Sequence, residues 1–125
     1  MQNTCPCGRG TPAAQCCLPY ITGAAQPPDP ESLMRSRYTA YTLHNADYIY
    51  ATTYPAERRH HNKKDILAWA KSCHWLKLEV LKAEGNSVEF KAYYLDSSLK
   101  PQVHHERSFF KMVGDAWFYA TGMFL

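Results

Sequence analysis

Four of the chain's five cysteines lie in one thirteen-residue stretch, CPCGRGTPAAQCC, which spans residues 5–17. A stretch this short cannot build a hydrophobic core, so its thiols have to supply what holds it folded. A tetrahedral zinc site needs four deprotonated ligands, which Cys-x-Cys and a following Cys-Cys provide from two short segments. Gly8 and Gly10 let the backbone between them turn tightly toward the sulfurs. The predicted zinc ligands are Cys5, Cys7, Cys16 and Cys17.

Three other interpretations of the cluster are open: two strained disulfides, an iron–sulfur cluster, and reactive thiols. Adjacent cysteines rarely bridge comfortably, and the spacing matches neither common ferredoxin pattern. The N-terminus has neither the basic nor the apolar segment of a secretory signal, so we expect a cytoplasmic protein in surroundings that oppose disulfides. Zinc is therefore favoured, and four cysteine ligands leave no open position for catalysis at the metal. The fifth thiol, Cys73, is expected to be buried and inert.

The whole chain has the composition of one globular domain with a small appendage. Hydrophobic residues make up 46% and charged residues 20% of its 125 residues, which is enough apolar surface for one core. No apolar run approaches the roughly 18 residues of a membrane span. The formal net charge of +3 comes from scattered basic residues and argues only weakly for nucleic acid. A nucleic-acid site would use Arg9, Arg35, Arg58, Arg59, Lys63 and Lys64.

A proline-rich connector separates the cysteine segment from the first predicted helix. Residues 1–23 show no regular period, and residues 24–30, AAQPPDP, are expected to be extended, because proline restricts its own backbone and that of the preceding residue. Asp29 is a suitable N-cap, and Pro30 fits the first helical position. The helix that follows has an inward stripe of Leu33, Met34, Arg37, Tyr38, Ala40 and Tyr41.

Two more helices are expected before any strand. The second follows Asn45 and stops before Pro55, a loop covers PAERRHH, and the third begins at Asn62. From Trp75 the period changes to two, with Leu76, Leu78 and Val80 on one face, and turns are expected at EGN, SSLKP and Gly114. Three helices packed on a curved antiparallel sheet make an α+β domain, which we expect over residues 31–125.

Two parts of the sequence resemble known families. CPCGRG…QCCLPYI resembles the SEC-C motif, a small zinc-binding element also found at the C-terminus of the protein-translocation motor SecA. DPESLMRSRYTAY and HHERSFFK…AWFYATG resemble the uncharacterised bacterial YchJ family, whose central domain is similar to the nuclear-transport-factor-two-like cone. The resemblance implies a zinc knuckle in residues 1–23 that contacts a protein partner. Many relatives carry a second SEC-C motif at the C-terminus, whereas this chain stops at Phe124-Leu125. The resemblance therefore does not extend to roles that need two zinc motifs.

Strand alternation puts Glu106, Ser108 and Phe110 on one face of their strand, although one strand does not fix which face points inward. If this face is concave, Glu106 meets the helices, and Arg37 is its candidate ion-pair partner. A structural ion pair is the simpler interpretation, and a small-molecule pocket is the other. The predicted pocket residues are Arg37, Tyr38, Trp75, Phe90, Tyr94, Glu106, Ser108 and Trp117.

The histidine pairs at residues 60–61 and 104–105 could suggest a second metal site or a general base. Neighbouring histidines in a strand point to opposite faces and cannot easily reach one ion, so both pairs are expected to be solvated or to pack. No nucleophile elbow, phosphate-binding loop, zinc-protease or dinucleotide motif is present, so enzyme activity has no positive signal. The leading hypothesis is a cytoplasmic accessory or adaptor protein whose knuckle contacts a protein partner. The contacts expected on the knuckle are Arg9, Pro12, Leu18 and Tyr20.

The alternative is a small-ligand binder or enzyme that uses the cone pocket, since this fold does not decide function by itself. A deep, polar, partly solvated cavity favours the ligand binder, whereas a packed cone with an exposed apolar knuckle favours the adaptor. The proline connector also suggests that the knuckle and the cone share little apolar core. Chelation is then expected to unfold residues 1–23 and to leave the cone largely intact.

Overall fold

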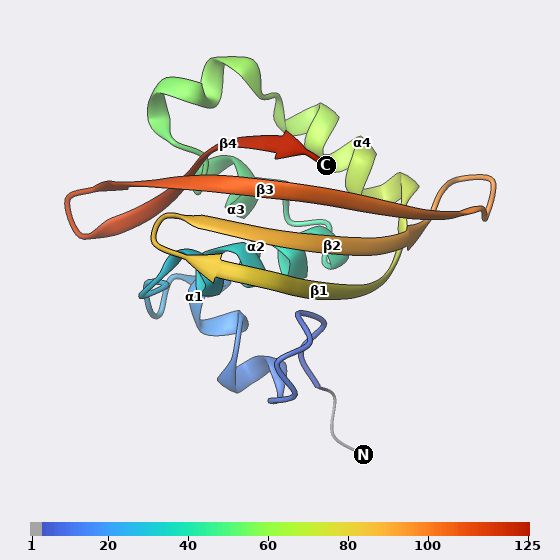
Figure 1. Ribbon diagram of the computed structural model, residues 1–125, viewed down its shortest axis with the longest axis horizontal. Coiled ribbons are helices and arrows are strands. Elements are labelled where there is room, and N and C mark those ends of the chain that lie inside the picture. The colour runs from blue at the N-terminus through green and yellow to red at the C-terminus, as the bar shows by residue number, and fades with distance from the viewer. Residues whose placement is uncertain (1–3) are drawn as a thin grey trace.

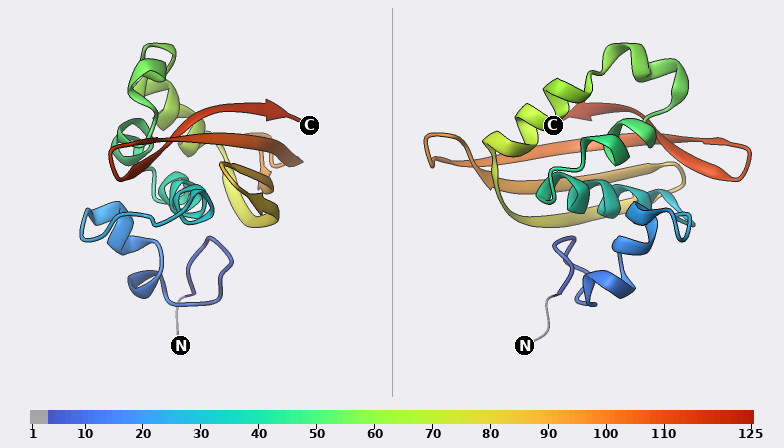
Figure 2. Two further views of the ribbon diagram at one scale, coloured as in Figure 1. Left: turned by 60° about the vertical axis from the view of Figure 1, so that its left-hand side comes forward. Right: turned by 180° about the vertical axis from the view of Figure 1, so that it is seen from behind.

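A four-stranded antiparallel sheet and the helices that cover its concave face form the two layers of the fold (Figures 1 and 2). The structure is a computed structural model that describes residues 4–125. The strands follow one another in the order β1-β2-β3-β4, as a meander does. Their bounds are β1 His74–Glu84, β2 Ser87–Leu95, β3 Pro101–Val113 and β4 Ala116–Phe124. The predicted α+β class with a curved antiparallel sheet is confirmed.

The helices of the cone start at the N-caps that the sequence predicts. Asp29 Oδ1 accepts a 2.7 Å hydrogen bond from the Ser32 amide, and the side chains of Asn45 and Asn62 accept equivalent bonds from their own helices. These helices are α2 Pro30–Thr42, α3 Ala46–Ala51 and α4 Lys63–Ser72. None of the helices within residues 4–125 combines the length and the apolar character that crossing a bilayer requires.

The segment PAERRHH is not the loop that we expected. It forms a short 3-10 helix, η2 Pro55–His60, because Pro55 presets the first turn and the Glu57 amide bonds back to the Tyr54 carbonyl at 2.8 Å. The backbone just before it is fixed to the sheet, since the Tyr54 amide donates to the Tyr119 carbonyl at 2.7 Å. The end of α3 is therefore held against β4, at the edge of the sheet.

The first strand departs from strict alternation near its start. A register shift between Trp75 and Lys77 turns Trp75 toward the helices and leaves Leu76 58% exposed, whereas Leu78 is buried. The prediction that Leu76 and Leu78 lie on one face of the strand is wrong, because a β-bulge adds one residue and reverses the alternation on its other side. The bulge lets Trp75 and Leu78 both face inward, which an unbroken strand would not allow.

The cysteine segment packs directly under α2 and beside β1 (Figure 1). It contains two short helices, η1 Ala13–Gln15 and α1 Leu18–Thr22, where the sequence shows no period. Its four buried cysteines belong to the same hydrophobic cluster as Leu33, Met34 and Leu78. A side chain at Gly8 would lie 3.3 Å from the Leu78 carbonyl oxygen, so the knuckle loop touches the backbone of β1. The expectation that the knuckle and the cone share little apolar core is wrong.

Candidate functional site

The four clustered cysteines form a candidate metal site. All four are buried, and their Sγ atoms lie within 4.8 Å of one another. The Sγ atoms of Cys7 and Cys16 are 3.5 Å apart, and those of Cys16 and Cys17 are 3.9 Å apart. A zinc–sulfur bond of about 2.3 Å places tetrahedral sulfurs about 3.8 Å apart, so the arrangement fits a zinc tetrathiolate. The predicted ligands thus come together, and all five cysteines, including the buried Cys73, are free.

The electrostatics of the cluster favour a thiolate at Cys7. A hydrogen bond from the Cys17 thiol lowers the pKa of Cys7 to about 5, against the effect of its burial. That same hydrogen bond, together with burial, raises the pKa of Cys17. A bound metal would replace the remaining protons and cross-link the two halves of the knuckle. Cys5, Cys7, Cys16 and Cys17 would hold the ion, and no ligand position would stay open.

Polar contacts fasten the cysteine cluster to helix α2. Arg35 Nη1 donates a 2.6 Å hydrogen bond to the Cys7 carbonyl oxygen, and Arg35 Nε donates a 2.9 Å bond to Glu31. Cys5 Sγ lies 3.5 Å from Thr39 Oγ1. Helix α2 is consequently buried on the side facing the knuckle as well as on the side facing the sheet.

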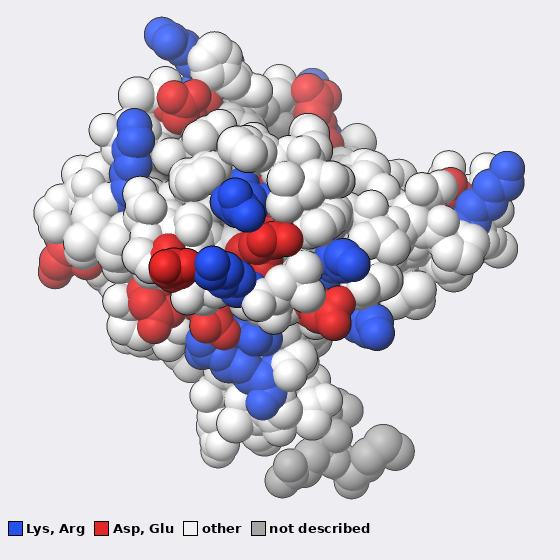
Figure 3. Space-filling model, viewed as in Figure 1, with Lys and Arg blue, Asp and Glu red and all other residues white. Residues whose placement is uncertain are grey.

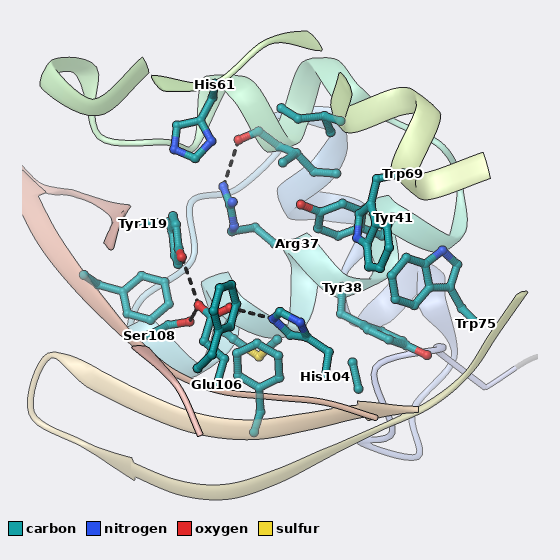
Figure 4. A pocket seen from close by; sticks show the side chains of 17 residues that line it. Arg37, Tyr38, Tyr41, His61, Trp69, Trp75, His104, Glu106, Ser108 and Tyr119 are labelled. Atoms are coloured by element: carbon teal, nitrogen blue, oxygen red, sulfur yellow. Dashed lines mark hydrogen bonds and ion pairs between the residues drawn. The ribbon is translucent and has the colours of Figure 1, made fainter. Parts of the chain in front are cut away.

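A second feature is a cavity of about 240 Å³ between helices α2, α3 and α4 and the concave face of the sheet (Figure 4). Its wall is largely aromatic, with a few polar side chains that converge on its centre. The two lining residues that are most exposed are Trp69, at 41%, and Phe124, at 78%. These side chains, from α4 and β4, mark the place where the cavity opens to solvent.

Six of the eight predicted pocket residues line this cavity: Arg37, Tyr38, Trp75, Phe90, Glu106 and Ser108. The other two, Tyr94 and Trp117, lie on the same face of the sheet but do not reach the cavity. Tyr94 lies behind Trp69 and Trp75, with ring centroids 5.3 Å and 5.4 Å away. Trp117 pairs with Met112 near the β3–β4 turn and packs into the core instead.

Glu106 is the polar centre of the cavity wall. Its Oε2 accepts hydrogen bonds of 2.6 Å from Ser108 and 2.9 Å from the Tyr119 hydroxyl, and its Oε1 lies 2.7 Å from His104 Nε2 (Figure 4). Burial raises the pKa of Glu106, but the hydrogen bonds from these three side chains outweigh it and hold the pKa below its usual value. The carboxylate therefore stays ionised inside a mostly apolar cavity.

Arg37 and Glu106 do not form the ion pair that the sequence suggested. Arg37 Nη1 donates instead to the Ile49 carbonyl at 2.8 Å and to Thr52 Oγ1 at 2.7 Å. The guanidinium carbon lies 4.6 Å from the centre of the Tyr119 ring, whose hydroxyl binds Glu106. Tyr119 thus separates the two charges, contacting Arg37 with its face and Glu106 with its hydroxyl.

Several lining residues were not predicted from the sequence: Met34, Tyr41, Ile49, His61, Ile66, Trp69, Ala92, His104, Phe110, Tyr119 and Phe124. His104 was assigned a solvated or packing role, although it lies two residues before Glu106 and alternation therefore places both on one face. Its neighbour His105 points to the other face and binds Glu89 at 2.8 Å, as expected for adjacent strand residues. At His61, burial and the nearby charge of Arg37 lower the pKa, which favours a neutral imidazole.

The family described as YchJ, middle NTF2-like domain, matches residues 29–122. The chain belongs to the YchJ family. A UPF0225 protein of Geobacter sulfurreducens is 42% identical to it, over 98% of this chain and 80% of that protein. A UPF0225 protein of Haemophilus influenzae strain PittEE is 39% identical, over 95% of this chain and 77% of the relative.

Two solved structures of SEC-C motif containing proteins share the fold of this YchJ family member. The solution structure of RPA3114 from Rhodopseudomonas palustris has a TM-score of 0.90 and 36% identity, over 100% of this chain and 99% of that one. The crystal structure of a protein from Psychrobacter arcticus has a TM-score of 0.79 and 33% identity, over 95% of this chain and 81% of that one. The first likeness includes the cysteine segment as well as the cone.

Proposed function

We propose that the protein binds a small organic molecule in the cone cavity, and that zinc on the four cysteines holds the helical wall of that cavity in place. The observation that carries the proposal is the combination of an open, aromatic cavity with the ionised Glu106 and the buried Arg37 on its wall. Ligand pockets are mostly apolar and contain a few precisely placed polar groups, as this one does. Two buried charges that are not paired with each other lower the stability of a core, so stability alone does not explain their presence.

The metal has a structural role in this proposal. The cysteine cluster contacts Arg35 and Thr39 of α2, and the same helix contributes Met34, Arg37, Tyr38 and Tyr41 to the cavity wall. Zinc suits four thiolates, and a closed site of this type contributes folding free energy rather than chemistry. A cytoplasmic location is part of the proposal, because thiolate ligands and the free Cys73 require reducing surroundings.

Contact with a protein partner through the knuckle has less support. The large apolar side chains that are exposed within residues 4–125 all lie outside the knuckle, from Leu43 onward. Leu18 and Tyr20, two of the contacts expected there, are only partly exposed.

The face of the sheet in Figure 3 shows lysines and arginines interspersed with acidic residues rather than gathered in a patch. On this face, that distribution gives no support to nucleic-acid binding.

The proposal is tested by soaking crystals of the metal-loaded protein with mixtures of small aromatic fragments that are anionic, neutral or cationic. We expect electron density for at least one fragment between Trp75 and Tyr119, because both side chains line the cavity. Crystals that take up no fragment of any charge in this cavity would contradict the proposal. A Cys16→Ser variant, which removes one metal ligand, is expected to weaken fragment binding together with stability.

A further inference from the structure

We infer that the ligand is a small aromatic carboxylate, with its carboxylate on Arg37 and its ring against the aromatic wall of the cavity; this rests on the proposed function. Arg37 is 8% exposed and reaches from α2 into the cavity, between His61 and Glu106 in the view of Figure 4. Its position is fixed by the helix that carries it and by the two hydrogen bonds that Nη1 donates to Ile49 and Thr52.

One edge of the Arg37 guanidinium is free to bind. The two protons on Nη1 are used by the Ile49 carbonyl and the Thr52 hydroxyl, whereas Nε and Nη2 donate no hydrogen bond to any residue within 4–125. Every fully buried side-chain nitrogen or oxygen in that range has a partner, so Nε and Nη2 retain contact with solvent. Nε and Nη2 form the edge that binds a carboxylate through two parallel hydrogen bonds.

The charge of Arg37 is also not neutralised by contact. Within residues 4–125, no carboxylate oxygen lies within 4.0 Å of its nitrogens, although the side chain is almost fully buried. Glu106 is turned away, because Ser108, Tyr119 and His104 already occupy its two oxygens. An isolated buried charge is costly, and an anion from the ligand would compensate for it.

The shape and charge of the cavity favour a carboxylate over a phosphate. One arginine faces the ligand and can pair with one negative charge, and the ionised Glu106 lies in the same cavity, so the second charge of a dianion would have no cationic partner. The volume of about 240 Å³ is below the roughly 300–1,000 Å³ of pockets for drug-sized ligands, which favours a small molecule. Trp69, Trp75 and Phe124 present aromatic rings from the mouth inward, which suits an aromatic ring.

The test measures the binding of four probes to the zinc-loaded chain by isothermal titration calorimetry: benzoate, benzamide, benzylamine and phenyl phosphate. We expect benzoate to bind at least about tenfold more tightly than benzamide, which matches its shape without the charge. Tighter binding of benzamide, benzylamine or phenyl phosphate would overturn the carboxylate inference and leave ligand binding intact. Failure of all four probes to bind would overturn both.

Two arginine variants test whether the preference for benzoate over benzamide depends on Arg37. Arg37→Gln is expected to lower the affinity for benzoate at least about tenfold and to leave that for benzamide unchanged. Arg58→Gln is the matched control, because Arg58 also donates to carbonyl oxygens near the end of α3, those of Thr53 and Ala51, yet does not line the cavity. Equal losses of benzoate affinity in the two variants would overturn the assignment of Arg37 as the side chain that binds the carboxylate. If circular dichroism shows that Arg37→Gln is unfolded, the carboxylate inference is decided by the ratio of the wild-type affinities for benzoate and benzamide.

Discussion

Arg35 Nη1 donates a 2.6 Å hydrogen bond to the carbonyl oxygen of Cys7 and so joins the cysteine cluster to the helix that forms one wall of the cone cavity. Arg35 is two residues from Arg37, which faces that cavity from the same helix, α2. The metal site and the cavity therefore share a structural element. Changes at the knuckle should be measurable in the cone.

Removal of the metal is expected to destabilise the whole chain. The buried cysteines, Leu33 and Leu78 belong to one hydrophobic cluster, so the knuckle cannot open without exposing the core side of α2. Structural zinc contributes about 10–16 kcal/mol in small metal-folded domains, which is as large as the total stability of a typical domain. Thermal unfolding with and without a chelator should show one transition that moves to lower temperature. A cone transition that stays in place while the knuckle melts separately would contradict this.

Arg35→Ala is expected to lower the free energy of unfolding by about 1–3 kcal/mol, because it leaves the Cys7 carbonyl without its partner. Urea unfolding measures the change. Arg9→Ala is the matched control, since Arg9 pairs with the same Glu31 at 3.6 Å but is far more exposed. Its effect should stay below about 1 kcal/mol. Equal effects of the two substitutions would mean that the Arg35–Cys7 bond contributes nothing of its own.

Gly122→Ala is expected to disrupt the Glu106 site. An added Cβ would overlap the Glu106 carboxylate and lie 2.7 Å from the Tyr119 hydroxyl, so one of these side chains must move. The loss should be at least about 2 kcal/mol of unfolding free energy, with weaker fragment binding. Met123→Ala, at the exposed next residue, should change little. A Gly122→Ala variant as stable as the wild type would show that the cavity wall adapts.

Glu106→Gln is expected to cost about 1.5–3 kcal/mol of unfolding free energy at neutral pH, because it removes a charged acceptor of three hydrogen bonds. Glu89→Gln tests the same chemistry on the outer face, where Glu89 binds His105 and Arg107 near solvent. Solvent competes there, so we expect little change in stability. Chemical unfolding of the two variants side by side checks the difference.

The stability that Glu106 contributes should depend on pH in a defined direction. Its pKa in the folded protein lies below the usual value of 4.5, so its contribution is complete above that value and is lost as the pH falls through the folded pKa. The difference in unfolding free energy between the wild type and Glu106→Gln should therefore be constant near neutrality and shrink in acid. A difference that grows as the pH falls would reverse the assigned direction.

Local sequence signals were sufficient for the three helices α2, α3 and α4, the four strands and the cysteine cluster, but not for the short helices η1, α1 and η2. Asp29, Asn45 and Asn62 act through hydrogen bonds to their own helices, and such short-range chemistry is visible in the sequence. The cysteine cluster is likewise confined to a short segment. The docking of this segment on α2 was missed, because Ser32 and Thr39 are buried polar residues and do not extend the apolar stripe.

The cavity was predicted only in part, because irregular backbone determines which side chains line it. The register shift near Trp75 changes which residues of β1 point inward. A second register shift, between Phe109 and Phe110, brings Tyr119 beside Glu106. Bulges have no reliable sequence signature, so strict alternation could not place Leu76 or Tyr119. The expected pairing of Arg37 with Glu106 failed for the same reason, since Tyr119 was not expected between them.

Ligand binding in the cone is tested most directly by the three tryptophan indole N–H signals in a nuclear magnetic resonance titration with benzoate. Trp69 and Trp75 line the cavity, whereas Trp117 packs elsewhere in the core and serves as an internal control. We predict saturable shifts of the Trp69 and Trp75 signals and a constant Trp117 signal. Constant signals from all three, or equal movement of Trp117, would contradict binding in the cavity.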